Sequence, residues 1–330
     1  MTDSVSISDQ LFHFADDLET ALSVPSSRTF ECDTIVLCGV GGSAVSGDIV
    51  ADCCAPHSSK PVISIHYPGM PSWVGPNTLV VVSSYSGNTA ETLEMYNQAT
   101  SRGCSVVALT SGGDLLRAAS RDGATVIRLP EGMHPRHAIG HMIGHTLAVV
   151  RDAGGSDLTD EILSVIPSLR EYRNAVSGGS GRAKVLAREL YGHVPVIVCD
   201  SRMRSVAFRW KTQINENSKF VAFCESAPPF DGWEHGDREG RCLPVILCGR
   251  TPGDEQASEG MDGIDASLNA IGHPHMMVEF EGSTWIETMF KAIILGDYMS
   301  VYMAEIRGID PSEVKPVMQL KAKLASLRER

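Results

Sequence analysis

Short runs of apolar, mostly β-branched residues alternate with longer amphipathic segments along this 330-residue sequence, and this alternation limits the folds open to it. Strands separated by helix-length segments are typical of a parallel sheet whose crossover connections are helices. In the first half we predict strands at 34–38, 62–66, 79–83, 106–109 and 126–129, and helices at 43–54, 88–102, 114–121 and 136–152. Each predicted helix follows a turn rich in Gly, Ser or Asn, as helix starts commonly do.

The second half repeats the alternation after a glycine-rich stretch. Residues 177–181 read Ser-Gly-Gly-Ser-Gly and contain no apolar anchor, which marks the neighbourhood of a boundary between the halves. Beyond it we predict strands at 194–199, 220–224, 243–248 and 276–280, and helices at 205–217, 254–271 and 284–307. The predicted fold is therefore α/β, with two doubly wound parallel-sheet domains. We assign an N-terminal helical segment to 1–30, the first domain to 31–153, the second to 154–310 and a C-terminal helix to 311–330.

The charge balance disfavours some classes of partner. Lys and Arg number 28 against 40 Asp and Glu, a net charge of −12 that repels phosphate backbones and anionic lipid. We expect neither nucleic acid nor a membrane as the main partner. A small anionic ligand remains open, because a few backbone N–H groups and one or two cations hold a phosphate locally.

The cysteines and the N-terminal residues point to a reducing compartment. Nine cysteines are scattered, no CxxC occurs, and neither a disulfide framework nor a zinc ribbon is readable. The first twenty residues carry acids instead of a basic patch and an apolar stretch, and the longest apolar runs are too short to span a bilayer. We expect a cytoplasmic protein.

A turn rich in hydroxyl residues follows the predicted strand 79–83. Ser84, Ser86 and Thr89 surround Gly87 and lead into a helix, whose first-turn N–H groups and dipole favour an anion. The competing interpretation is an ordinary Ser/Thr helix cap, but a cap uses one hydroxyl and here there are three. Open α/β sheets bind ligands at this position, so we predict a phosphate site.

A second turn, Gly39-Val40-Gly41-Gly42-Ser43, follows the first predicted strand. In a parallel sheet it would face the same crevice as the hydroxyl turn. A dinucleotide site is the rival interpretation, but the spacing is not GxGxxG, because Ala stands at position 44.

Four segments together resemble a known family. They are residues 39–43, residues 84–93, Pro135-Arg136, and the Asn-Glu-Asn-x-Lys of 215–219, and the similarity extends to 304–308. The sequence resembles the bifunctional phosphoglucose/phosphomannose isomerases, which consist of two SIS (sugar isomerase) domains. The resemblance implies flavodoxin-like SIS domains, a homodimer without metal or other cofactor, and aldose–ketose isomerisation of a hexose phosphate in a cleft between the domains and the partner subunit.

The resemblance also implies roles for single residues. The phosphate-binding positions are Gly41, Gly42, Ser43, Ser84, Ser86 and Thr89. Glu216 matches the catalytic base and Arg136 the arginine near the reacting carbons. Isomerisation moves a proton between C1 and C2 through a cis-enediol, so it needs one carboxylate within reach of both carbons and a cation for the developing enediolate.

Two positions depart from the family pattern. The family has a ring-opening His just before the position of Trp233, and this chain has Asp231 there, with His235 two residues beyond the tryptophan. The family's Thr before a Pro at the start of the terminal helix is Lys315 here. We take Asp231 and His235 as provisional acid–base candidates and expect a divergent member of the family.

Four histidines stand close together before and within the predicted helix 136–152. His137, His141 and His145 are four residues apart and share one helix face, and His134 lies across Arg136. Such spacing can ligate zinc, but no carboxylate or thiolate partner lies nearby in sequence. A subunit contact or the rim of the active site is the favoured interpretation, and His134 or His137 is a candidate replacement for the ring-opening histidine.

Two alternatives to this function stay open. One is a biosynthetic paralogue whose substrate is an open-chain or modified sugar phosphate, such as an amino sugar phosphate. The other is a non-catalytic SIS protein that senses a sugar phosphate.

Overall fold

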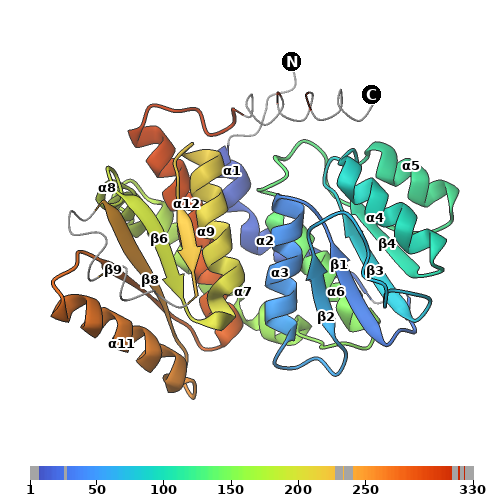
Figure 1. Ribbon diagram of the computed structural model, residues 1–330, viewed down its shortest axis with the longest axis horizontal. Helices are drawn as coiled ribbons and strands as arrows, with labels where there is room; N and C mark the ends of the chain where they lie inside the picture. Colours follow the sequence, from blue (N-terminus) through green and yellow to red (C-terminus); the bar gives the residue numbers. More distant parts are fainter. Residues whose placement is uncertain are drawn as a thin grey trace.

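Two parallel β-sheets organise the molecule (Figure 1). The computed structural model describes residues 7–25, 28–226, 233, 241–313, 319 and 323. The first sheet has the order β2-β1-β3-β4-β5 and the second the order β7-β6-β8-β9, and every neighbouring pair is parallel. The strands are β1 Thr34–Cys38, β2 Val62–Ile65, β3 Thr78–Ser83, β4 Ser105–Thr110, β5 Thr125–Arg128, β6 Val194–Cys199, β7 Phe223–Glu225, β8 Cys242–Arg250 and β9 Met276–Glu281.

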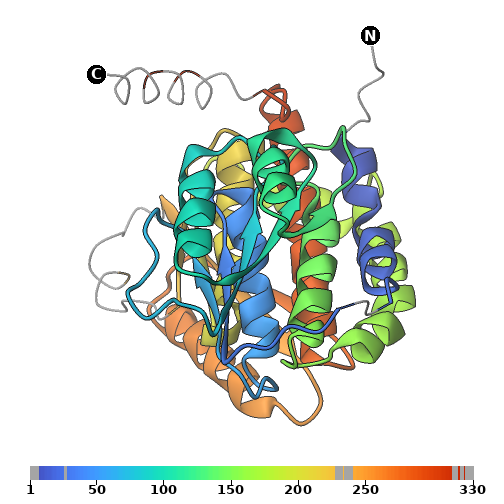
Figure 2. The same cartoon turned by 90° about the vertical axis from the view of Figure 1, so that its right-hand side faces the viewer.

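Helices cover both faces of the first sheet (Figures 1 and 2). The helices of both halves are α1 Ile7–Phe12, α2 Phe14–Leu22, α3 Gly42–Cys54, α4 Ala90–Ser101, α5 Gly113–Arg121, α6 Ile139–Asp152, α7 Thr159–Ser177, α8 Arg182–Glu189, α9 Arg204–Asn217, α11 Glu255–Ala270 and α12 Trp285–Ile306, with a 3₁₀ turn at Ser201–Met203. Successive strand residues point to opposite faces. Val80 and Val82 therefore pack with α4 and α5, whereas Leu79 and Val81 pack with α3 and α6.

One hydrophobic core joins the two sheets. It contains Leu37 from the first sheet and Ile197 and Phe280 from the second, together with the helices between them. Trp210 of α9 lies fully buried in it and donates its indole N–H to the carbonyl of Ala292, at 2.8 Å. A Cβ at Gly296 would lie 2.3 Å from that indole nitrogen, so glycine lets α12 approach α9 closely.

The predicted fold class is confirmed, and the nine predicted strands are present. The largest difference is β7, which begins at Phe223 instead of 220. The residues before it form the turn that ends α9. In this turn Lys219 adopts a φ of 53°, and the side-chain amide of Asn215 donates a hydrogen bond to the carbonyl of Phe220. Helices α7 and α8 were not predicted. The glycine-rich stretch connects them, and both pack against α12.

The domain boundaries remain predictions. Most of the expected C-terminal helix at 311–330 lies outside the described residues. Within the described part of the chain, none of the helices combines the length and apolar character needed to cross a lipid bilayer.

Candidate active site

The two predicted turns lie beside each other. They follow β1 and β3, which are paired in parallel up to Cys38 and Val82. Because β2 lies beyond β1 while β4 and β5 lie beyond β3, the chain reverses its direction of winding between β1 and β3. Such a switch point is where open α/β sheets form a crevice for ligands.

The Ser43 hydroxyl of the first turn contacts the backbone of the second turn, whose own hydroxyls contact each other. The backbone N–H of Tyr85 donates to Ser43 Oγ at 3.4 Å, and Ser84 Oγ donates to Thr89 Oγ1 at 3.4 Å. Ser43 and Ser84 are buried, whereas Ser86 is exposed. Thr89 occupies the N-cap position of α4, but its side chain makes no capping hydrogen bond. The simple helix-cap interpretation therefore does not describe Thr89.

Glycines shape the first of these turns. Gly41 adopts a φ of 63°, in the left-handed region that favours glycine. A Cβ at Gly42 would lie 3.2 Å from the Cα of Arg136. The turn after β1 therefore packs directly against the backbone of Arg136, which the sequence separates from it by almost a hundred residues.

Arg136 is buried and three groups hold its guanidinium. Its Nε donates to Asn217 Oδ1 at 2.7 Å, and its Nη2 donates to the carbonyl of Pro311 at 2.6 Å. Its Nη1 lies 3.5 Å from Glu216 Oε2. Burial lowers the pKa of Arg136, partly offset by Glu216, but an arginine stays charged at neutral pH. The structure thus brings together the predicted base and the predicted cation.

Glu216 lies in the last turn of α9 and keeps its carboxylate accessible. Its side chain is 43% exposed, against 5% for that of Arg136. Lys219 donates its Nζ to the backbone carbonyl of Glu216 and, at 3.3 Å, to that of Pro311. Burial, and then the charge of Arg136, lower the pKa of Lys219. An accessible carboxylate beside two cations suits proton abstraction from a carbon whose negative charge must be stabilised.

A buried polar layer supports Arg136, and the sequence analysis assigned it no role. Asn217 is fully buried and donates its amide to Ser300 Oγ at 2.9 Å. Arg209 donates to both carboxylate oxygens of Asp297, at 2.9 and 2.6 Å, and to the backbone carbonyl of Arg136 at 3.0 Å. Asn217 stands in the Asn-Glu-Asn segment and could have been found there. No sequence signal links Arg209 to Asp297, 88 residues away.

Two predicted candidates cannot be placed. Asp231 and His235 lie outside the described residues. Trp233 between them is described and buried, and its ring stands edge-on to that of His273 at 5.2 Å between centroids.

The histidines divide into two pairs. The rings of His134 and His137 lie 5.7 Å apart beside Arg136, whereas those of His141 and His145 stack at 6.1 Å. His141 Nε2 lies 3.1 Å from Asp17 of α2. Among the residues that the structure describes, no group of three or more His, Cys, Asp or Glu side chains is arranged to hold a metal ion.

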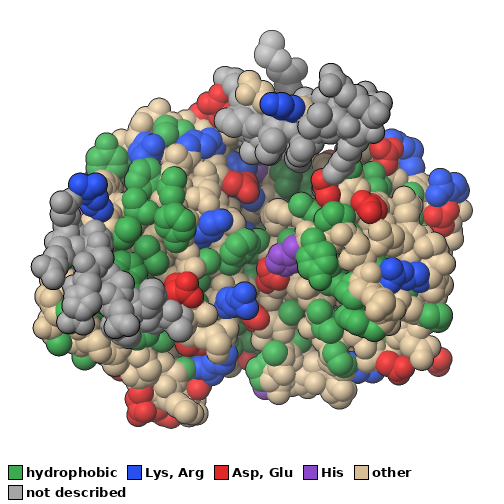
Figure 3. Space-filling model, in the orientation of Figure 1, with side chains coloured by type: hydrophobic (Ala, Val, Ile, Leu, Met, Phe, Trp, Pro, Cys, Tyr) green, Lys and Arg blue, Asp and Glu red, His purple; other side chains and the backbone are tan. Residues whose placement is uncertain are grey.

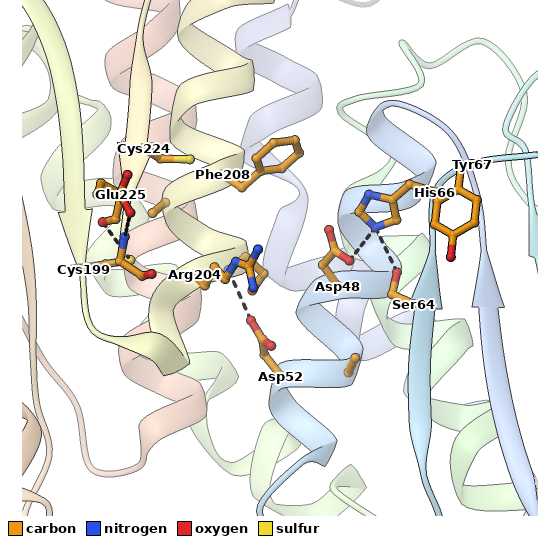
Figure 4. A pocket seen from close by; sticks show the side chains of 14 residues that line it. Asp48, Asp52, Ser64, His66, Tyr67, Cys199, Arg204, Phe208, Cys224 and Glu225 are labelled. Carbon is orange, nitrogen blue, oxygen red and sulfur yellow. Dashed lines mark hydrogen bonds and ion pairs between the residues drawn. The ribbon is translucent and has the colours of Figure 1, made fainter. Parts of the chain in front are cut away.

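A separate cavity of about 530 Å³ lies between the two halves (Figure 4). Asp48 and Asp52 of α3 face Arg204 and Phe208 of α9 across it, and His66 Nε2 donates to Asp48 Oδ1 at 2.6 Å. None of the residues predicted from sequence for the site lines this cavity. Arg204 and Phe208, which line the cavity, stand in the first half of α9, whereas Glu216 stands in its last turn.

Known proteins resemble this chain over most of its length. The model of the bacterial phospho-glucose isomerase C-terminal SIS domain matches residues 180–324. A bifunctional phosphoglucose/phosphomannose isomerase of Caldicellulosiruptor bescii is 32% identical over 313 residues, 91% of this chain and 91% of that protein. A D-glucosamine-6-phosphate 4-epimerase of Sulfolobus acidocaldarius is 29% identical over 298 residues, 88% of this chain and 92% of that protein.

Solved structures show the same architecture. The tagatose-6-phosphate ketose/aldose isomerase of Escherichia coli has a TM-score of 0.70 at 17% identity, covering 93% of this chain and 95% of that one. Identity at this level establishes the shared fold only, whereas the similarity to the C. bescii protein spans nine-tenths of both sequences. This chain therefore belongs to the bifunctional phosphoglucose/phosphomannose isomerase family.

Proposed function

We propose that this protein interconverts aldose and ketose forms of a hexose phosphate through a cis-enediol. Glu216 removes the proton from C2 of the aldose and returns it to C1. The observation that carries the proposal is the accessible carboxylate of Glu216, 3.5 Å from the buried guanidinium of Arg136. That guanidinium is held in place by Asn217 and Pro311, so it needs no rearrangement when charge develops on the substrate oxygens.

The phosphate of the substrate would bind at the two turns. Ser43, Ser84, Ser86 and Thr89 offer hydroxyl donors there, and the start of α4 adds unpaired backbone N–H groups. The contact of Gly42 with Arg136 supports one continuous site, in which the phosphate on C6 binds at the turns while C1 and C2 lie near Arg136 and Glu216. The family members named for hexose phosphate isomerisation support the substrate class.

The test is hydrogen exchange at the carbon beside the carbonyl. We expect the protein to incorporate deuterium from D₂O at C2 of glucose 6-phosphate or mannose 6-phosphate. A general base contributes about 10²- to 10⁴-fold, so Glu216→Gln should lose at least about 100-fold in exchange rate. Glu189→Gln, which changes an exposed carboxylate at the end of α8, is the matched control and should exchange like the wild type. Exchange at the wild-type rate in Glu216→Gln would overturn the proposal.

An amino sugar phosphate is the second candidate substrate. The relative named for an epimerase of D-glucosamine 6-phosphate favours it, at an identity close to that of the isomerases. Glucosamine 6-phosphate should therefore be included in the same exchange experiment. A higher kcat/KM for glucosamine 6-phosphate than for glucose 6-phosphate and mannose 6-phosphate would select this alternative.

We also propose that the chain works as a homodimer in the cytoplasm. The edge strands β2 and β7 both line the cavity between the halves. Exposed apolar side chains accompany them, namely Ile63, Tyr67, Val221 and Phe223, and Figure 3 shows hydrophobic side chains spread over both halves. Unpaired edges with apolar side chains are commonly covered by a partner.

The cysteines bear on the proposed compartment. All nine cysteines are free thiols, which supports a reducing compartment.

Sedimentation analysis tests the dimer. Phe223→Glu should shift the protein towards a monomer, because a charge would be buried at the contact. Val185→Glu changes an exposed apolar residue of α8 and should leave the sedimentation coefficient unchanged. A Phe223→Glu protein that sediments like the wild type would exclude this face as the contact.

A further inference from the structure

A hexose phosphate must lose its ring before Glu216 can act. In the cyclic hemiacetal, C1 carries no carbonyl, so the proton on C2 is not acidic. Opening the ring requires a proton to leave the hydroxyl on C1 and another to reach the ring oxygen, O5. A group that can both accept and donate a proton near C1 performs this step best.

His134 is the described side chain that fits this requirement. Its backbone N–H donates to Gln10 Oε1 at 2.8 Å, which fixes the segment that leads to Arg136. Its ring is close enough to Arg136, Asp310 and Lys219 for their charges to act on it, and Arg136 and Lys219 also contact Glu216. The His134 side chain is partly exposed, and none of the described residues forms a hydrogen bond with its ring nitrogens.

Burial and nearby cations favour the neutral form of His134. Burial lowers its pKa most and the charge of Arg136 lowers it further, while Asp310 raises it and Lys219 has a smaller lowering effect. A neutral imidazole carries one N–H donor and one acceptor nitrogen. It therefore offers both functions of the ring-opening step at the same time.

His137 does not compete for this role. It is 1% exposed, and neither ring nitrogen has a hydrogen-bond partner among the described residues. Burial, together with Arg136 and Arg209, lowers its pKa well below the usual value. A ring enclosed in this way cannot touch a substrate, although it packs edge-on against the ring of His134.

We propose that His134 opens the hexose phosphate ring in this chain, an inference that rests on the proposed isomerase function. One imidazole nitrogen accepts the proton of the C1 hydroxyl, and the imidazolium returns a proton to O5. The C1–O5 bond breaks, the C1–O1 double bond forms and O5 becomes a hydroxyl, so charge and protons balance. Glu216 then acts on the open-chain aldehyde.

The decisive experiment measures ring opening without isomerisation. An enzyme that opens and closes the ring also interconverts the α and β anomers of glucose 6-phosphate, and exchange NMR measures that rate directly. In a Glu216→Gln background, isomerisation should stop while anomer exchange continues. Adding His134→Gln should then lower the catalysed anomer exchange by at least about 10-fold, the lower part of the range for general acid–base catalysis.

The controls separate this proposal from the proposed function. His57→Gln changes an exposed histidine at the end of α3 and should leave anomer exchange unchanged. If His134→Gln does not fold, His134→Asn takes its place, with the circular dichroism spectrum as the check. Undiminished anomer exchange without His134 overturns the proposal, and so does a wild type that isomerises but does not accelerate anomer exchange. Persistent deuterium exchange in Glu216→Gln would refute the proposed function while the anomer assay still decides the role of His134.

Discussion

At the scale of single residues, Gly87 is required by both its backbone and its surroundings. Its φ is 68°, and a Cβ would lie 1.8 Å from the carbonyl oxygen of Gly112 in the neighbouring loop. That loop also accommodates Gly113, whose Cβ would lie 2.3 Å from the carbonyl oxygen of Ser86. The hydroxyl turn is therefore held in shape by a close contact between two backbones.

We predict that Gly87→Ala destabilises the protein by about 2–5 kcal/mol. Left-handed backbone in a residue with a Cβ costs about 1–2 kcal/mol, and overpacking adds about 1–3 kcal/mol. Gly123→Ala is the matched control, because Gly123 has a similar φ of 69° but no atom within 4 Å of its Cβ position. Urea denaturation measures both. Equal losses in the two variants would show that the contact with Gly112 does not matter.

The hydroxyl of Tyr85 connects the same turn to the segment before Arg136. It donates to the carbonyl of Pro130 at 2.8 Å and accepts the backbone N–H of Met133 at 2.8 Å. Tyr85→Phe leaves both groups unpaired, so we expect a loss of about 1–3 kcal/mol in stability and a lower kcat/KM.

The control for this prediction is Tyr96→Phe, which removes a hydrogen bond to Asp122 remote from the site. It should lower the melting temperature without changing kcat/KM. Kinetics with fructose 6-phosphate and thermal denaturation distinguish the two variants. A Tyr85→Phe enzyme with unchanged kcat/KM would show that the tie to Pro130 and Met133 does not position Arg136.

At the scale of elements, α12 carries much of the support for the site. Its N-cap Thr284 accepts a hydrogen bond from the N–H of Glu287 at 3.2 Å, and further along it supplies Asp297 and Ser300 to the layer below Arg136. Burial alone would raise the pKa of Glu287, but hydrogen bonds from Lys291, Ser168 and Ser283 outweigh it and lower the pKa to about 2. The first turn of α12 is thus stabilised by an ionised carboxylate.

We predict that the contribution of Glu287 to stability depends on pH. A carboxylate with a lowered pKa stabilises the folded state fully above its unfolded pKa of about 4.3, and this contribution disappears as the pH falls towards about 2. Glu287→Gln should therefore cost about 2 kcal/mol at pH 7 and much less near pH 2.5. The exposed Glu281→Gln should show no such change. A difference in unfolding free energy that is constant from pH 7 to 2.5 would contradict the prediction.

At the scale of the whole molecule, the two sheets share their stability. The core that contains Leu37 and Leu79 of the first sheet also contains Val245 and Phe280 of the second. Polar contacts cross between the halves as well: the N–H of Ser205, at the start of α9, donates to Asp52 of α3 at 3.2 Å. Figure 1 shows these two helices side by side between the sheets.

We predict one cooperative unfolding transition. A continuous core makes it unfavourable to expose one half while the other stays folded. Hydrogen exchange of peptides from β3 and β8 should lose protection at the same urea concentration, at each of two protein concentrations. Two separate midpoints would show that the halves unfold independently.

How far the site can be predicted depends on distance along the chain. The hydroxyl turn and the glycine turn are local patterns, so Ser84 and Ser43 could be placed at strand ends without a structure. The approach of Glu216 to Arg136 was predicted only through a family resemblance, because 80 residues separate them. Neither a local pattern nor the family resemblance indicated the contact of Arg209 with Asp297. Helices α7 and α8 were missed because the glycine-rich stretch that joins them outweighed their weak apolar pattern.

The sequence alone determined the alternation of strands and helices, and hence the parallel sheets with ligand-binding turns at their carboxyl ends. These properties follow from local periodicity and from turn chemistry, which neighbouring residues decide. Only the tertiary structure decided that Arg136 is buried against Gly42 and held by Asn217, that His134 rather than His137 is accessible, and that one core joins both sheets. Such contacts form between residues far apart in the chain, where packing and the satisfaction of buried polar groups, not local preference, select the partner.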